Sequence, residues 1–117
     1  MKIREISEAL NAKVLCAAEL LDHEVFAACG SDMMSDVLAH VKNQAVLLTG
    51  LVNPQVIRTA EMMDIVCVVM VRGKEPTEAM VELAEDRGIP ILATQTRMFS
   101  ACGILYNAGL LQEGGMD

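Results

Sequence analysis

The hydrophobic pattern of the chain is organised around Ile65–Val71, its longest uninterrupted apolar run, which is rich in β-branched residues. A run without alternation that ends in a Gly turn, here Arg72-Gly73-Lys74, is typical of a strand buried on both faces of a helix-covered parallel sheet. Pro76 and the apolar residues of Thr77–Arg87 follow at helical spacing, up to Gly88. The pattern therefore predicts a strand, a turn, and a helix with Pro near its start and Gly at its end.

Similar units recur along the rest of the chain. Further strands are predicted at Lys13–Ala17, Val25–Cys29, Gln44–Thr49 and Pro90–Ala93, and further helices at Ile3–Leu10, from Ser31 or Asp32 to about Val41, from Pro54 to about Met63, and from Thr96 to Asn107. Strands that alternate with helices through short turns form right-handed crossovers and a mostly parallel sheet. The predicted fold class is therefore α/β, with a three-layer, mostly parallel sheet of about five strands and helices on both faces.

Details of this scheme depend on a few residues. Ser31 or Asp32 is expected to cap the helix after the second strand, and Thr96 to cap the last helix. The first two strands are short and joined by the charged connector Glu19–Glu24, which leaves an antiparallel direction open for one of them. The tail Gln112–Asp117, with two adjacent glycines, is expected to be frayed.

The composition fits one domain that spans residues 1–117. Because 53% of the residues are apolar and only 3% aromatic, the core is expected to be aliphatic, with nine Met available to fill gaps. This is more aliphatic surface than one small core readily hides, and it predicts a homodimer.

Charge and hydropathy exclude several classes of partner. No apolar run approaches the ~20 residues of a membrane span, and Met-Lys-Ile-Arg-Glu at the start lacks the apolar stretch of a signal peptide. We therefore expect a cytoplasmic protein that does not bind membranes. The net charge of −7 and the scattered Lys and Arg residues argue against nucleic acid as a partner.

Signatures of catalysis are absent from the sequence. It contains no phosphate-binding G-x-x-x-x-G-K-[ST], no G-x-G-x-x-G, no H-E-x-x-H and no G-x-S-x-G. Cys67 lies inside the apolar run and is expected to be an inert, buried thiol. No two cysteines form a C-x-x-C pair, so a metal or redox site would need Cys16, Cys29 and Cys102 to converge.

The residues that remain as candidates form a rim. Ligands of open α/β sheets bind outside the carboxyl ends of the strands, where glycines let the backbone approach a ligand and helix N-termini offer N–H groups to an anion. Arg72 and Lys74 add a pair of positive charges there, and a small anionic ligand, a nucleotide by preference, is the predicted occupant. The alternative is that these residues form ordinary turns. The candidate ligand-binding residues are Gly30, Ser31, Asp32, Ser35, Asp36, Thr49, Gly50, Arg72, Gly73, Lys74, Thr94 and Thr96.

Several of these segments resemble a known family. Residues 31–40, Ser-Asp-Met-Met-Ser-Asp-Val-Leu-Ala-His, are similar to the Ser-Asp-Leu-Leu-Ser-Asp-Val-Met motif of small DRTGG-domain proteins, and Arg72–Pro76 and Gly88–Thr94 fit the same domains. The likeness runs from about Ile3 to Gly109, although the string Asp-Arg-Thr-Gly-Gly does not occur.

The resemblance implies a regulatory role. Such proteins resemble the N-terminal domain of HPr kinase/phosphorylase, whose kinase activity belongs to a separate P-loop domain that this sequence does not contain. DRTGG domains also occur joined to CBS domains, phosphotransacetylase and inorganic pyrophosphatase, where they look like regulatory or dimerising modules.

Three functional hypotheses follow. The first is a non-catalytic regulatory or ligand-sensing homodimer that needs no cofactor, binds a small anionic ligand such as a nucleotide, and leaves a protein partner open. The second is an enzyme or phosphotransfer participant centred on Asp32, Ser35 and Asp36. The third is a metal or redox module that uses Cys16, Cys29 and Cys102.

Overall fold

The computed structural model describes residues 1–40 and 44–112 of the chain. They form a six-stranded sheet, and its strands are β1 (Lys13–Val14), β2 (Ala27–Gly30), β3 (Ala45–Thr49), β4 (Ile65–Met70), β5 (Ile91–Ala93) and β6 (Leu111–Gln112). The order across the sheet is β1-β5-β4-β3-β2-β6. All neighbouring strands run parallel except β1, which is antiparallel to β5.

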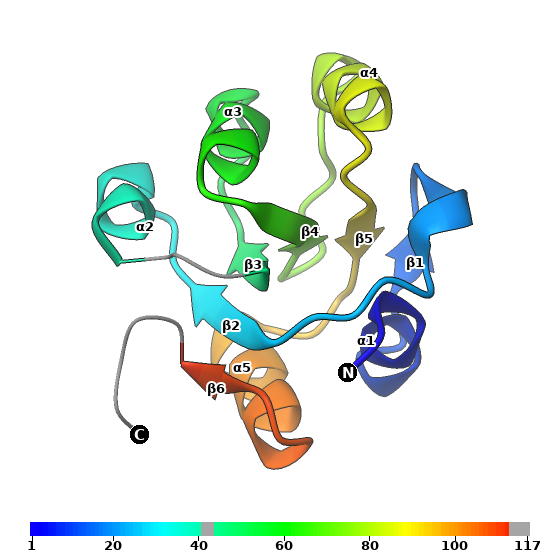
Figure 1. Cartoon of the computed structure of the whole chain (residues 1–117), viewed down its shortest axis with the longest axis vertical. Helices are drawn as coiled ribbons and strands as arrows, with labels where there is room; N and C mark the ends of the chain where they lie inside the picture. The colour runs from blue at the N-terminus through cyan, green and yellow to red at the C-terminus, as the bar shows by residue number, and fades with distance from the viewer. Residues whose placement is uncertain (41–43, 113–117) are drawn as a thin grey trace.

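Helices cover both faces of the sheet, as predicted. They are α1 (Ile3–Ala9), the short 3₁₀ helix η1 (Ala18–Leu20), α2 (Met34–His40), α3 (Gln55–Met62), α4 (Glu78–Arg87) and α5 (Met98–Asn107). Figure 1 shows α2, α3 and α4 on one face and α1 and α5 on the other. The three-layer α/β architecture is thus confirmed, with β6 as a short extra strand beside β2. Most of the tail that was predicted to be frayed, residues 113–117, lies outside the described residues.

The central strand β4 is removed from water on both faces. Residues Cys67–Val71 have no exposed surface, and their side chains alternate between two apolar clusters. Val68 and Met70 pack with the buried residues of α2, α3 and α4, whereas Cys67 and Val69 pack with those of α1 and α5. The prediction of a strand buried on both faces is confirmed.

The capping residues predicted from the sequence are found at α4 but not at α2 and α5. Thr77 caps α4 by accepting a hydrogen bond from Met80 N–H at 3.2 Å, and Gly88 ends the helix at a φ of 68°. The expected cap on α2 is wrong, because the Ser31 hydroxyl accepts from Met33 N–H before the helix begins, and Asp32 binds elsewhere. Thr96 is not the cap of α5, which begins after Arg97 without a side-chain cap.

The connection that leaves β4 and the connection that leaves β5 run in opposite directions across the sheet. The connections from β2 to β5 each advance by one strand, with α2, α3 and α4 on the same face (Figure 1). The connection after β5 then runs through α5 on the other face and returns to β6 at the far edge. The turns that leave β4 and β5 therefore lead to opposite faces, and in open α/β sheets this switch is where a crevice forms.

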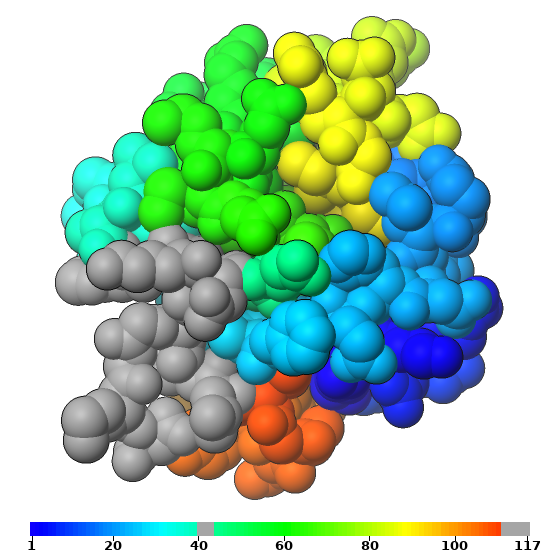
Figure 2. Space-filling view, in the orientation of Figure 1, coloured from blue at the N-terminus to red at the C-terminus, as the bar shows by residue number. Residues whose placement is uncertain are grey.

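The opposite edge of the sheet is the one at which the parallel strands begin. Figure 2 shows this edge, where the light-blue segment before β2 meets the green region of α3 and β4.

No helix in the described part of the chain has the length and hydropathy needed to cross a membrane.

The burial of Cys67 in β4 predicts that its thiol reacts slowly. Desolvation raises the pKa of the Cys67 thiol far above its ordinary value, so the reactive thiolate is scarce and the sulfur is inaccessible. In the native protein we expect Cys67 to react with a thiol reagent only through opening of the sheet, and therefore far more slowly than the partly exposed Cys102. Mass spectrometry of labelled peptides over time would measure both rates, and equal rates would contradict the burial of β4.

Candidate functional site

The turns that follow the parallel strands are hydrogen-bonded to one another at the carboxyl edge. The turn after β4 is the central one: Val71 N–H donates to the Thr49 carbonyl at 3.0 Å, and Arg72 N–H donates to the Thr96 carbonyl at 2.9 Å. The backbone thus joins the ends of β3, β4 and β5, and the predicted rim is a continuous structure.

Asp32 fastens this rim through its side chain. Its Oδ1 accepts hydrogen bonds from Gly50 N–H at 2.7 Å and from the Thr49 hydroxyl at 3.1 Å. Its Oδ2 lies 3.4 Å from Nη2 of Arg72, and both side chains are about two-fifths exposed. One carboxylate therefore holds together the turns after β2, β3 and β4.

Arg72 reaches Asp32 because of its backbone conformation. Its φ is 60°, in the left-handed region that a side chain such as arginine rarely adopts. The guanidinium lies directly over Gly50, where any Cβ would collide with it. Gly50 is thus required for the close approach of Arg72, and the strained residue sits at the rim rather than in an ordinary strand.

The two rim threonines are buried and have structural partners. Thr49 is fully buried, and its oxygen donates to Asp32 and accepts from Leu51 N–H at 3.1 Å. The Thr94 hydroxyl donates to the Leu10 carbonyl at 2.7 Å and accepts from Thr96 N–H at 3.2 Å. These hydroxyls shape the turns and tie them to α1.

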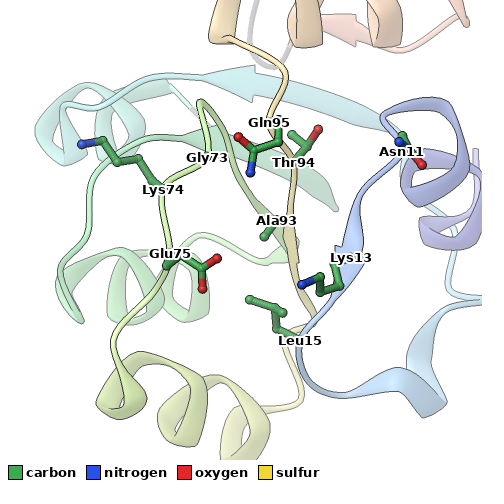
Figure 3. A pocket seen from close by; sticks show the side chains of 9 residues that line it. All are labelled: Asn11, Lys13, Leu15, Gly73, Lys74, Glu75, Ala93, Thr94 and Gln95. Carbon is green, nitrogen blue, oxygen red and sulfur yellow. The ribbon is translucent and has the colours of Figure 1, made fainter.

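A pocket of about 140 Å³ opens at the switch between β4 and β5. It lies between the turn after β4, the end of β5 and the start of β1, and its lining residues are Asn11, Lys13, Leu15, Gly73, Lys74, Glu75, Ala93, Thr94 and Gln95. In Figure 3 the side chains of Lys13 and Glu75 extend toward one another across the pocket, whereas that of Lys74 points away. The pocket therefore places one cation inside and a second at its border.

The structure divides the residues predicted for this site into three groups. Gly73, Lys74 and Thr94 line the pocket, and Asp32, Thr49, Gly50 and Arg72 form the adjoining rim, with Thr96 in the same turn as Thr94. The remaining residues lie apart from the pocket. Ser35 and Asp36 are exposed on α2, Ser31 bonds to Met33, and Gly30 lies against the sulfur atoms of Cys102 and Met98 in α5.

Sequence reasoning missed the part of the pocket that β1 supplies. Lys13 was expected only as a strand residue, but it pairs with Ala93 across the antiparallel β1 and β5. An antiparallel strand brings its first residues to the edge where its parallel neighbours end, so Asn11 and Lys13 reach the carboxyl edge. The signal was the open direction of the first strand, since an antiparallel β1 implies this placement.

A larger pocket of about 300 Å³ lies at the amino edge, remote from these turns. Its lining cation Arg87 is already paired, because it lies 3.3 Å from Glu61 and 3.7 Å from Asp86. The smaller pocket is the candidate site, because it lies at the crossover switch, Lys13 and Lys74 line it, and the turn that carries the strained Arg72 borders it.

The cysteines do not form a site. None of the four is joined to another in a disulfide. Cys16 and Cys29 pack against the cluster under α2, α3 and α4, whereas Cys102 packs against the other cluster. Among residues 1–40 and 44–112, no three His, Cys, Asp or Glu side chains are grouped so as to hold a metal ion.

Comparison with known proteins identifies the fold and the family. The family description of the DRTGG domain matches residues 5–108. No curated protein matches the chain. Among solved structures, the chain is similar to the CBS and DRTGG domains of the regulatory region of Clostridium perfringens pyrophosphatase, complexed with its activator diadenosine tetraphosphate. The TM-score is 0.71 at 14% identity, which shows the shared fold, and the match covers 89% of this chain and 45% of that one.

Two variants of Asp32 distinguish the contribution of its hydrogen bonds to the free energy of unfolding from the contribution of its charge. Asp32→Ala removes the acceptor for Gly50 N–H and the Thr49 hydroxyl, and we expect it to lower the free energy of unfolding by about 1–3 kcal/mol. Asp32→Asn keeps an acceptor oxygen and loses only the exposed pair with Arg72, so it should lower that free energy by less than about 1 kcal/mol. Urea unfolding of the three proteins measures this, and equal losses for both variants would show that the charge, not the hydrogen bonds, matters.

Proposed function

Because this chain belongs to the DRTGG domain family, we propose that it is a non-catalytic regulatory module that senses a small anionic ligand. In this proposal residues 1–117 act as one domain, two copies form a homodimer, and the ligand, a nucleotide or polyphosphate by preference, binds at the carboxyl edge between β4 and β5. A protein partner that reads out the bound state is compatible with this role.

The observation that carries the proposal is the position and charge of the pocket. It lies where the crossovers reverse, which is the usual ligand site of an open α/β sheet. Lys13 extends into it, and Lys74 and Arg72 stand on the turn beside it. In a chain with a net charge of −7, these three cations outnumber the two carboxylates that face them, Glu75 and Asp32, and the local balance favours an anion.

The backbone adds hydrogen-bond donors to this edge. Helix α5 starts directly after the turn that follows β5, and its N-cap residue Arg97 makes no side-chain cap. In this proposal the first N–H groups of the helix are donors to the anion, and the helix dipole favours negative charge there.

The pocket size limits what can bind inside it. At about 140 Å³ it is smaller than the roughly 300–1,000 Å³ of pockets that enclose a whole organic ligand. A phosphate group fits such a volume, and the rest of a nucleotide would extend along the rim toward Arg72 and Asp32. The related regulatory region binds a ligand with a polyphosphate chain, which supports this class of ligand by analogy.

The geometry favours sensing over catalysis. Asp32 of the enzymatic alternative is engaged by Thr49, Gly50 and Arg72, which gives it a structural role. Ser35 and Asp36 do not line the pocket. Among the residues that line the pocket, Lys13 faces Glu75. In this proposal a bound anion pairs with Lys13 and changes its contact with Glu75.

A cytoplasmic location and a homodimer remain parts of the proposal. Four cysteines with no disulfide among them suit a reducing compartment. The exposed apolar side chains, among them Phe26 and Phe99 at 62% and 92% exposure, suit a chain that associates.

Calorimetry with adenine and guanine nucleotides and inorganic triphosphate tests the ligand. Each charge-assisted hydrogen bond is worth about 1.5–3 kcal/mol, so Lys13→Ala and Arg72→Ala should each weaken binding by about tenfold or more. Arg58→Ala, which removes an equal charge from the exposed face of α3, should leave binding unchanged. The affinity of the unaltered protein should also fall with added salt.

Two results would contradict the proposed site. No binding of any of these anions would show that the rim is only a set of turns. Binding that survives both Lys13→Ala and Arg72→Ala would place the ligand elsewhere on the domain.

A further inference from the structure

The three aromatic side chains of the chain are all on the surface. Phe26, Phe99 and Tyr106 are 62%, 92% and 57% exposed, although large aromatic side chains gain more from burial than any others. Two of the three lie on α5. This helix therefore presents an unusual concentration of exposed apolar surface.

Helix α5 is also uncharged from end to end. Met98–Asn107 contains no Asp, Glu, Lys or Arg, whereas every other α-helix in the described part of the chain has at least one. Its inner side is buried through Ala101 and Leu105, and its outer side exposes Phe99, Ile104 and Tyr106. A helix that is apolar all round normally has a partner on each side.

The spacing on the outer side suits a copy of itself. Gly103 stands four residues after Phe99 and three before Tyr106, so the three lie along one side of the helix. A Cβ added at Gly103 would meet no atom within 4 Å, so the space above it is open. If two such helices cross antiparallel near Gly103, Phe99 of each faces Tyr106 of the other, which is the self-complementarity of a two-fold interface.

We infer that the outer face of α5, made by Phe99, Gly103, Ile104 and Tyr106, is the surface on which two copies of this chain associate. The two α5 helices pack antiparallel, with the two-fold axis beside Gly103. This inference rests on the homodimer of the proposed function and assigns its interface.

Charge selects a second copy as the occupant. Two chains of −7 repel each other, and groups beside the two-fold axis meet their own copies, so the interface forms most readily where carboxylates are absent near the axis. A basic partner would instead be recognised by acidic residues, which α5 lacks. The uncharged face of α5 meets this condition for self-association.

The available area is of the right order. With about 150–250 Å² for each aromatic side chain, Phe99 and Tyr106 at their observed exposures supply roughly 300 Å² per copy. That is about half of the ~600 Å² that each copy contributes to a small standard interface. Ile104 adds to this area, and Ser100 and Asn107 border the face and extend it.

The test is the mass of the full chain in solution. By light scattering we expect the unaltered protein to have the mass of a dimer and the double variant Phe99→Asp, Gly103→Glu to have half that mass. Both positions are exposed, and circular dichroism of the variant checks that it stays folded. Phe26→Asp, which removes an aromatic side chain from the amino edge, is the matched control and should remain dimeric.

A cysteine variant tests the geometry independently. Gly103→Cys places two thiols beside the two-fold axis, so mild oxidation should yield a covalent dimer, whereas Glu82→Cys on the far side, in α4, should not. A dimeric protein whose mass is unchanged by Phe99→Asp, Gly103→Glu would overturn this interface while leaving the homodimer standing. A monomeric unaltered protein would overturn both, without bearing on the calorimetric test of ligand binding.

Discussion

The burial of β4 on both faces is the constraint on which the other elements depend. Its side chains alternate into two apolar clusters, so a single strand forms part of the core beneath α2, α3 and α4 and of the core beneath α1 and α5. A strand of this kind cannot lie at an edge, and its position in the middle of the sheet fixes where its turn emerges. Arg72 and Gly73, which follow β4, therefore lie between the ends of β3 and β5. The buried core fixes this position independently of the residues on the surface.

The rim that results is held by interactions over long distances in the sequence. Asp32 accepts hydrogen bonds from residues 17 and 18 positions later and pairs with Arg72, 40 positions away. The Arg72 side chain pairs with Asp32 and does not line the pocket, where Lys13 is the inward-pointing cation. An anion at this edge would compete with Asp32 for Arg72, which offers a physical route by which binding could loosen or re-form the contacts among three turns.

Much of the fold could be predicted because its signals are local. The unbroken apolar run of β4, the Thr77 cap and the left-handed Gly88 each identify a boundary from a few adjacent residues. The site could be predicted only in part, because its chemistry depends on non-local partners. Asp32 resembles a helix cap in sequence, and nothing in its neighbourhood indicates Gly50 as its partner. Lys13 was missed because a two-residue strand has no periodicity from which its direction can be inferred.

The scarcity of aromatic residues has a spectroscopic consequence. The chain contains no Trp and a single Tyr, and that residue, Tyr106, lies on the exposed side of α5. Its intrinsic fluorescence therefore arises from one known position at the surface and none from the aliphatic core. Loss of the core packing changes this signal little, whereas anything that covers or uncovers α5 changes the surroundings of its only efficient emitter. The molecule thus has a built-in optical probe of one helix face, free of background from the rest of the fold.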